Sequence, residues 1–166
     1  SVWILRTLIA IGLTKSMGVW LLVAGSAMVS IGAFYYLIMQ FDEYRQRAAI
    51  ITPLLTLALA LLWFSYPYTL IYDMPNLALF IVSYVLMVQK RWAPYLFVFT
   101  LACLNKETAA LLAIGFAAMT FRTMTWRKYI ALGAVQFAIW LVVRVAIVAA
   151  FGNNPGGIME SHLSQH

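Results

Sequence analysis

The sequence predicts an all-α fold: a polytopic bundle of transmembrane helices with a short broken or re-entrant helical hairpin. The chain is 64% apolar and only 10% charged, whereas a soluble domain has about 45–50% apolar and about 25% charged residues. Its longest apolar runs can cross the hydrocarbon core of a bilayer, which takes about 20 residues. Basic residues collect in short segments between these runs, as they do in cytoplasmic loops.

The first clear span covers residues 17–40 and follows a break at Thr14-Lys15-Ser16. Polar residues at 42–47 separate it from a second span at 48–65. Pro53 lies in the first turns of that second span, where a helix tolerates a missing N–H. These features predict two helices that cross the membrane in succession.

Residues 66–76 contain two prolines and three tyrosines, and Tyr prefers the level of the lipid headgroups. We therefore expect an interfacial loop in this segment. Pro75 suits the first position of the next helix, with Asp73 or Met74 near its cap. This helix is expected to run to about Gln89.

Three loops contain most of the basic residues of the chain: 45–47, 90–91 and 122–128. We place them on the cytoplasmic side, because short cytoplasmic loops are enriched in Lys and Arg. The span 17–40 then runs inward, a final span at 129–151 runs outward, and Asp73 lies outside.

The apolar segment 93–121 lies between two of these basic loops, so it must turn back if both are inside. Each limb of about 11–14 residues would reach roughly 17–21 Å, too short to cross. The turn is expected at 105–108, where Asn105 or Thr108 caps the second limb and Glu107 in its first turn suits the helix dipole. The alternative is one straight helix of about 28 residues, roughly 42 Å long, which would place the last basic loop outside.

On this topology, six polar residues fall on the outer side: Asp73, Asn76, Asn105, Lys106, Glu107 and Arg144. Ionisable residues at membrane depth are costly and are functional candidates by default. The two acids, Asp73 and Glu107, are the candidate catalytic residues. Either could act as a general base or bind a divalent cation, which is the candidate cofactor.

The cations and amides of this group are the candidate substrate-binding residues. Lys106 and Arg144 suit a phosphate group, because a cation and an anionic oxygen form strong hydrogen bonds. Asn76 and Asn105 complete the set. An anionic, lipid-linked substrate would fit these residues.

The same residues also have structural interpretations. Lys106 and Glu107 could be an ion pair that satisfies a helix turn, although neighbours on one helix do not face each other, so each is expected to have a partner elsewhere. Arg144 could extend to the outer headgroups or lie over the indole ring of Trp140. Asp73 could cap a helix.

Several classes of function lack their motifs in this sequence. It contains no zinc-ligand spacing, Walker loop, dinucleotide glycine fingerprint or Gly-x-Ser-x-Gly elbow. The net charge of +6 fits cytoplasmic loops better than nucleic-acid binding. The single Cys103 forms no internal disulfide.

Two short motifs carry a resemblance to a known family. They are Tyr72-Asp73-Met74-Pro75-Asn76 with the apolar residues that follow to Phe80, and Leu104-Asn105-Lys106-Glu107-Thr108-Ala109. With the basic loop between them, they resemble bacterial polytopic proteins of the GT-C glycosyltransferase-like superfamily, over roughly residues 48–166. The resemblance implies transfer of a sugar from a polyprenyl-phosphate donor at the extracytoplasmic face of the inner membrane.

One departure from the family limits what the resemblance implies. The family's usual catalytic acid lies in the first large outer loop, and no Asp-x-Asp-like or Glu-x-Asp-like pair occurs here. We expect residues 1–166 to be a single transmembrane domain that is part of a longer chain. If the loop with the catalytic acid lies upstream, these residues hold the donor-side scaffold and not that acid.

Two other functions remain open. The chain could be a transporter segment in which Lys106 and Glu107 line an ion or substrate path, or a non-catalytic subunit whose polar residues bind partner helices. The expected partners are membrane lipids, a polyprenyl-phosphate-linked sugar, and partner membrane subunits or the remainder of the chain. Nucleic acid is not expected.

Cysteine accessibility tests the predicted hairpin. A cysteine that replaces Thr123 should react with an impermeant maleimide only from the cytoplasmic side, because a hairpin returns the chain to the side from which it entered. A cysteine that replaces Thr108, at the tip, should react from outside. Labelling of position 123 from outside would rule out the hairpin.

Overall fold

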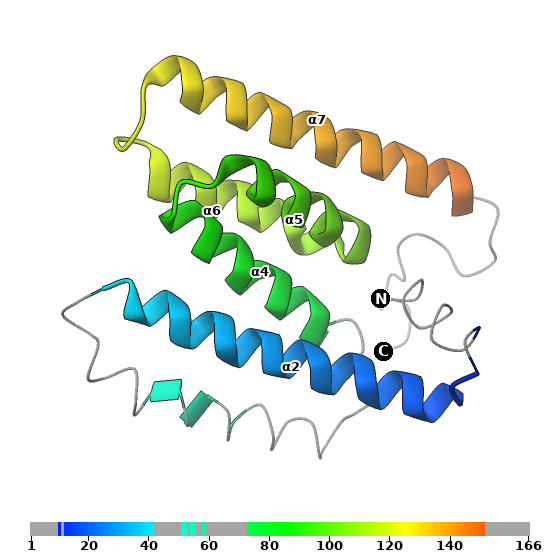
Figure 1. Cartoon of the computed structure of the whole chain (residues 1–166). Coiled ribbons are helices and arrows are strands. Elements are labelled where there is room, and N and C mark those ends of the chain that lie inside the picture. The colour runs from blue at the N-terminus through cyan, green and yellow to red at the C-terminus, as the bar shows by residue number, and fades with distance from the viewer. Residues whose placement is uncertain are drawn as a thin grey trace, which may run out of the picture. The chain divides into compact units, whose positions relative to one another are not determined.

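A computed structural model of the protein describes residues 10, 12–41, 51–52, 54–55, 58 and 73–151. In these residues the regular structure is entirely helical (Figure 1). The elements are α2 (Lys15–Met39), α4 (Asp73–Val88), α5 (Trp92–Asn105), the 3-10 turn η3 (Glu107–Ala109), α6 (Ala110–Thr120) and α7 (Trp126–Phe151).

The all-α class predicted from the sequence is confirmed for this part of the chain. The predicted span 48–65 lies mostly outside the described residues. The chain divides into two compact units, residues 1–112 and 113–166.

The first unit contains α2, which begins two residues before the predicted span. Thr14 is its N-cap, and the hydroxyl oxygen of Thr14 accepts a hydrogen bond of 3.3 Å from the backbone N–H of Met17. This bond satisfies one of the N–H groups that lack a partner at the start of a helix. The predicted break before this span is therefore confirmed at Thr14, whereas Lys15 and Ser16 already belong to the helix.

Helices α2 and α4 pack side by side and run in the same direction. Near their beginnings, Val19 and Val23 of α2 form a buried cluster with Met74 of α4. Near their ends, the Gln89 side chain donates a hydrogen bond of 2.9 Å to the Tyr36 hydroxyl. A parallel pair is what the predicted orientation requires, because both helices were expected to run inward.

Small residues are buried on both α2 and α4. Ala27 and Ser30 of α2 and Ala78 and Ser83 of α4 are all buried. The Ser30 hydroxyl donates a hydrogen bond of 2.8 Å to the Ser26 carbonyl, so it needs no partner on α4. Small residues let helix backbones approach closely, and in lipid this close packing drives helix association.

Helix α4 begins earlier than the sequence predicts. Asp73 and Met74 were expected in a loop or cap and Pro75 at the first helical position, but all three lie in the helix. Pro75 is tolerated because the first N–H groups of a helix have no intrahelical acceptor. The Asp73 carboxylate in the first turn suits the positive end of the helix dipole.

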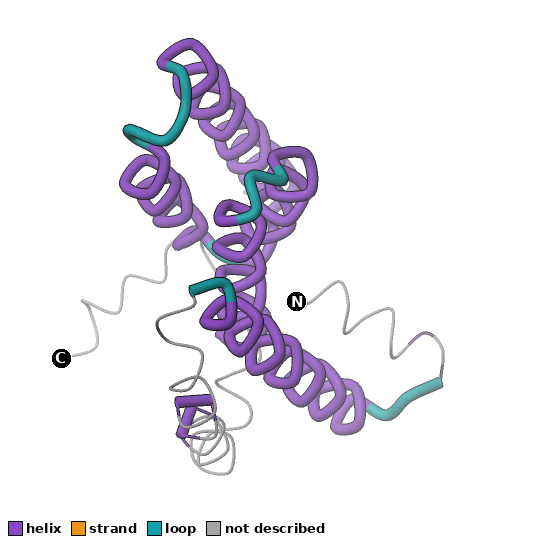
Figure 2. Tube along the Cα trace, turned by 60° about the vertical axis from the view of Figure 1, so that its left-hand side comes forward, coloured by secondary structure: helices purple, strands orange, loops and turns teal. Residues whose placement is uncertain are grey.

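A tight turn reverses the chain between α4 and α5. The N–H of Arg91 bonds to the Leu86 carbonyl at 2.9 Å and the N–H of Lys90 bonds to the Met87 carbonyl at 3.0 Å. This is a Schellman motif, and Lys90 occupies its left-handed position with a φ of 56°. Figure 2 shows the short loops that separate the helices.

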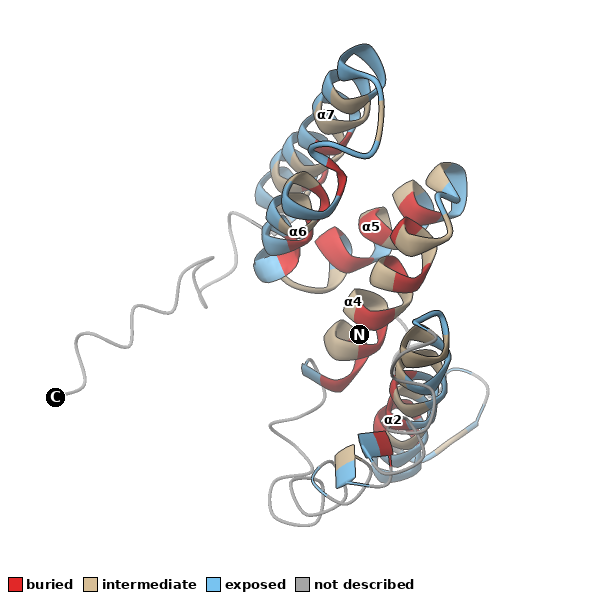
Figure 3. Cartoon of the chain, turned by 90° about the vertical axis from the view of Figure 1, so that its left-hand side faces the viewer, coloured by how far each residue is buried: buried red, intermediate tan, exposed pale blue. Residues whose placement is uncertain are grey.

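Helix α5 carries much of the buried surface of the first unit. Tyr95, Phe99 and Ala102 are fully buried, and Cys103 is a buried free thiol. In Figure 3 the buried residues gather on α4 and α5, whereas much of α2 is exposed. The core of this unit therefore lies around α4.

The apolar segment 93–121 is broken, as predicted. Helix α5 ends at Asn105, and Lys106 has an extended backbone with φ −154° and ψ 147° before η3 and α6 begin. The alternative of one straight helix is therefore wrong. The cap was misassigned: Lys106, not Asn105 or Thr108, occupies the N-cap position, and its side chain makes no capping bond. Glu107 lies in the first turn, as expected.

The second unit is dominated by α7, which begins three residues before the predicted start at 129. The N–H of Tyr129 bonds to the Thr125 carbonyl at 3.0 Å, so the helix already includes Trp126, Arg127 and Lys128. The basic segment expected as a loop is therefore partly helical. Its last two cations lie in the first turn of α7.

Two described helices are long and apolar enough to cross a membrane: Ser16–Met39 and Trp126–Ala150. Only 17% and 11% of their most apolar windows are buried in the protein. A core helix of a soluble protein with this composition would be buried on most sides, whereas lipid can cover these exposed faces. The helices Asp73–Val88, Trp92–Asn105 and Glu107–Thr120 are apolar but shorter.

The left-handed residue in the Schellman motif yields a test of stability. Replacing Lys90 with Gly should stabilise the protein by about 1 kcal/mol relative to Lys90→Ala, because a side chain in this conformation costs about 1–2 kcal/mol. Both variants lose the same charge, so the comparison isolates the backbone. Thermal unfolding in mild detergent, followed by circular dichroism, measures the difference. Equal stability of the two variants would contradict the left-handed assignment.

Candidate functional site

Polar side chains from two distant parts of the sequence meet at one end of the first unit. They are Asp73 and Asn76 from the start of α4, and Lys106 and Thr108 from the break after α5. We call these four residues the polar cluster. Helices α4 and α5 have 16 and 14 residues, so a tight turn between them brings the end of α5 back to the start of α4. The four residues meet because α4 and α5 are nearly equal in length.

The first contact of the polar cluster is an ion pair. The Lys106 ammonium donates to the Asp73 carboxylate, and the two side chains are 41% and 51% exposed. The sequence predicted that Lys106 would find a partner other than its neighbour Glu107, and this is confirmed. Since both side chains are about half exposed, the pair remains accessible to a further ligand.

The second contact joins the same two segments one turn farther on. The Asn76 side-chain N–H donates a hydrogen bond of 3.3 Å to the Thr108 hydroxyl oxygen. Asn76 follows Asp73 by three residues, which places both on one face of α4. The carbonyl oxygen of the Asn76 side chain is buried and accepts no hydrogen bond from the described residues. Buried acceptors are normally satisfied, so this oxygen is an exception among the described residues.

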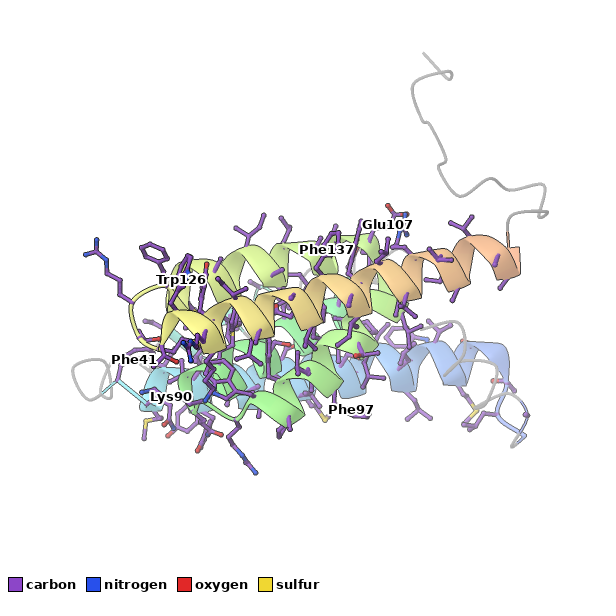
Figure 4. The ribbon with its side chains drawn as sticks, turned by 90° about the horizontal axis from the view of Figure 1, so that it is seen from above. Phe41, Lys90, Phe97, Glu107, Trp126 and Phe137 are labelled. Carbon is purple, nitrogen blue, oxygen red and sulfur yellow. The ribbon has the colours of Figure 1, made fainter. Side chains whose placement is uncertain are left out.

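The remaining predicted residues occupy different places. Asn105 is half-buried at the end of α5, next to Lys106 in the chain. Glu107 is exposed at the start of η3, and Figure 4 shows its side chain projecting from the ribbon. Arg144 belongs to the second unit, on α7, one turn after Trp140.

The sequence predicted a different role for one residue of the polar cluster. Thr108 was expected only as a helix cap, yet its hydroxyl accepts a bond from Asn76. The sequence did place Thr108 in the predicted break, two residues after Lys106, and this position marks it as a candidate for the same cluster. What the sequence lacked was the register between α4 and α5, which determines which residues meet.

A divalent cation does not fit the polar cluster well. The Asp73 carboxylate is already engaged by the Lys106 ammonium, and that positive charge would repel a metal ion bound beside it. In the part of the chain that the structure describes, no three His, Cys, Asp or Glu side chains gather in a way that could hold a metal ion.

Comparison with known proteins finds no matching family model, no matching curated protein and no matching solved structure. The interpretation of the polar cluster therefore rests on its geometry and chemistry.

A double-mutant cycle measures the strength of the ion pair. We expect Asp73→Asn and Lys106→Met to show a coupling energy below about 1 kcal/mol, because ion pairs with exposed side chains are worth about 0.2–1 kcal/mol. Unfolding of the two single variants and the double variant in mild detergent gives this energy. A coupling above about 3 kcal/mol would contradict the exposed geometry, since only a buried pair is coupled so strongly.

Proposed function

We propose that this chain is a multi-pass protein of the bacterial inner membrane and part of a GT-C-like glycosyltransferase. It would transfer a sugar from a polyprenyl-phosphate donor at the extracytoplasmic face. The observation that carries this proposal is the contact between Lys106 and Asp73. These residues come from the two motifs of the family resemblance, 33 positions apart in the sequence, and they belong to one cluster.

Lys106 suits the phosphate of the donor. An ammonium group has three N–H donors, and the ion pair uses one of them, which leaves two for phosphate oxygens. Hydrogen bonds between an ammonium and an anionic oxygen are about twice as strong as neutral ones. In this arrangement Asp73 holds the Lys106 side chain in position.

Sugar transfer also requires a base and a stabilised leaving group. The acceptor hydroxyl attacks the anomeric carbon, its proton passes to a carboxylate, and the bond between that carbon and the donor phosphate breaks. We assign the base to Glu107, because Asp73 already holds Lys106. The departing phosphate carries the negative charge, and the Lys106 ammonium stabilises it. Asn76, whose amide N–H lies on the Thr108 hydroxyl beside the ion pair, is assigned to the sugar side of the donor.

A second candidate function has one observation in its favour. Asp73 and Lys106 neutralise each other, as they would in a structural contact that joins α4 to the break after α5. In that case the chain would be a non-catalytic membrane subunit or a transporter segment. Activity measurements on matched variants separate the two functions.

Turnover of a polyprenyl-phospho-sugar by the purified full-length protein tests the proposal. Glu107→Gln should lower kcat by about 100-fold or more, because general bases contribute about 10²–10⁴-fold. Lys106→Ala should lower kcat/KM by about 10- to 100-fold, since a charged hydrogen bond is worth about 1.5–3 kcal/mol.

Two variants with the same chemical changes elsewhere serve as controls. Glu43→Gln and Lys90→Ala lie in the predicted cytoplasmic loops and should leave turnover unchanged. Unchanged turnover in both Glu107→Gln and Lys106→Ala would remove the site assignment. If those two variants altered ion flux through reconstituted vesicles instead, the transporter function would replace the enzyme.

A further inference from the structure

The second unit has a group of cations and aromatic rings that the proposed sugar transfer does not use. The group surrounds the turn between α6 and α7, and we call it the aromatic–basic turn. It consists of Phe121, Arg122, Trp126, Arg127, Lys128 and Tyr129. This turn lies directly at the start of Trp126–Ala150, a helix long enough to cross a membrane.

The aromatic rings of the turn are held together around Tyr129. The Trp126 ring stacks on Tyr129 with centroids 5.4 Å apart, and the buried Phe116 ring stacks on Tyr129 at 5.9 Å. Phe121 meets Tyr129 edge-on at 6.1 Å. The turn therefore has a defined shape, because contacts between rings fix their relative orientation.

The outer members of this ring group are exposed. Phe121 and Trp126 are 55% and 62% exposed, and Figure 4 shows Trp126 at the beginning of α7. Ile130, one turn after Trp126, is also exposed. Exposed aromatic rings at the end of an apolar helix are typical of the boundary between lipid headgroups and acyl chains.

The cations of the turn are exposed and have one sign. Arg122, Arg127 and Lys128 all reach solvent, and the Arg122 guanidinium lies over the Phe121 ring at 5.9 Å. The sequence contains no Asp or Glu between Thr108 and Met159. Within this segment of the sequence, the turn therefore has three cations and no acidic residue.

These cations do not serve the helix on which they lie. Arg127 and Lys128 are in the first turn of α7, which contains no acidic residue. The start of a helix carries a partial positive charge, so cations there are unfavourable for the helix. An anion outside the protein would offset this cost.

We propose that the aromatic–basic turn binds the headgroup of an anionic glycerophospholipid. Arg122 and Arg127 bind the phosphodiester, and Phe121 and Trp126 contact the glycerol and the first part of the acyl chains. A free phosphate ion would use the cations but leave the exposed rings without a contact, so the combination favours a lipid. The proposal rests on the membrane location in the proposed function and is independent of sugar transfer.

Native mass spectrometry of the full chain in neutral detergent tests this site, with phosphatidylglycerol as the probe and phosphatidylcholine as the neutral comparison. Each basic residue near an anionic headgroup strengthens binding by about five-fold. The double variant Arg122→Gln/Arg127→Gln should therefore bind phosphatidylglycerol about 25-fold more weakly, with phosphatidylcholine unaffected. Phe121→Leu/Trp126→Leu, which keeps every charge, should also weaken binding of phosphatidylglycerol.

A matched control removes two cations from the other described basic turn. Lys90→Gln/Arg91→Gln should retain the binding of phosphatidylglycerol, and an equal loss in both double variants would overturn the site, because only net charge would then matter. Competition by glycerol phosphate at the concentration of the lipid would also overturn it, in favour of a free-phosphate site.

Insertion into phosphatidylcholine vesicles separates this inference from the proposed function. A wild-type chain that inserts but shows no preference for phosphatidylglycerol would overturn the lipid site alone. A chain that fails to insert would overturn the membrane location, and with it both proposals.

Discussion

A single extended residue, Lys106, is the constraint on which the polar part of the first unit depends. Helices α4 and α5 are nearly equal in length and are joined by a tight turn, so the end of α5 returns to the start of α4. The extended backbone stops the helix at that level, and the Lys106 side chain meets Asp73 while Thr108 meets Asn76. One more helical turn at this point would carry Lys106 past its partner. The break therefore gathers the polar side chains at one end and leaves the rest of α5 apolar.

The exposed apolar side chains of the two longest helices are a second constraint, because they limit the surroundings in which these helices are stable. Large apolar side chains such as Phe137 and Val142 on α7 are about two-thirds exposed, and few positions on that helix are buried. In water, exposed apolar surface of this extent leads to association. In a bilayer it costs nothing, and an unbroken helix satisfies its own backbone groups there. Small residues are also buried on both α2 and α4, and such residues favour the association of helices in lipid, where the hydrophobic drive between helices is absent.

The polar cluster and the aromatic–basic turn differ in net charge, so they suit different kinds of ligand. In the polar cluster, Asp73 and Lys106 compensate each other, so the cluster can lie beside apolar helices at a modest electrostatic cost and still offer donors to a phosphate. In the aromatic–basic turn the described charges are all positive, and exposed rings accompany them. In the two proposals above, the balanced pair is assigned to a substrate, and the surplus of positive charge beside aromatic rings is assigned to a lipid headgroup.

The sequence by itself determined the class of fold, the ends of the long helices to within about three residues, and the break in the apolar segment 93–121. These features depend on local chemistry: hydropathy along the chain, a capping Thr14, and an interruption of apolar residues at 105–108. It also marked Asp73, Asn76 and Lys106 as unusual. Only the tertiary structure decided that Asp73 pairs with Lys106 and that Thr108 accepts a bond instead of capping a helix. Those contacts depend on the register between α4 and α5. The register is set by the lengths of both helices together with the left-handed turn between them, so it cannot be read from any short stretch of sequence.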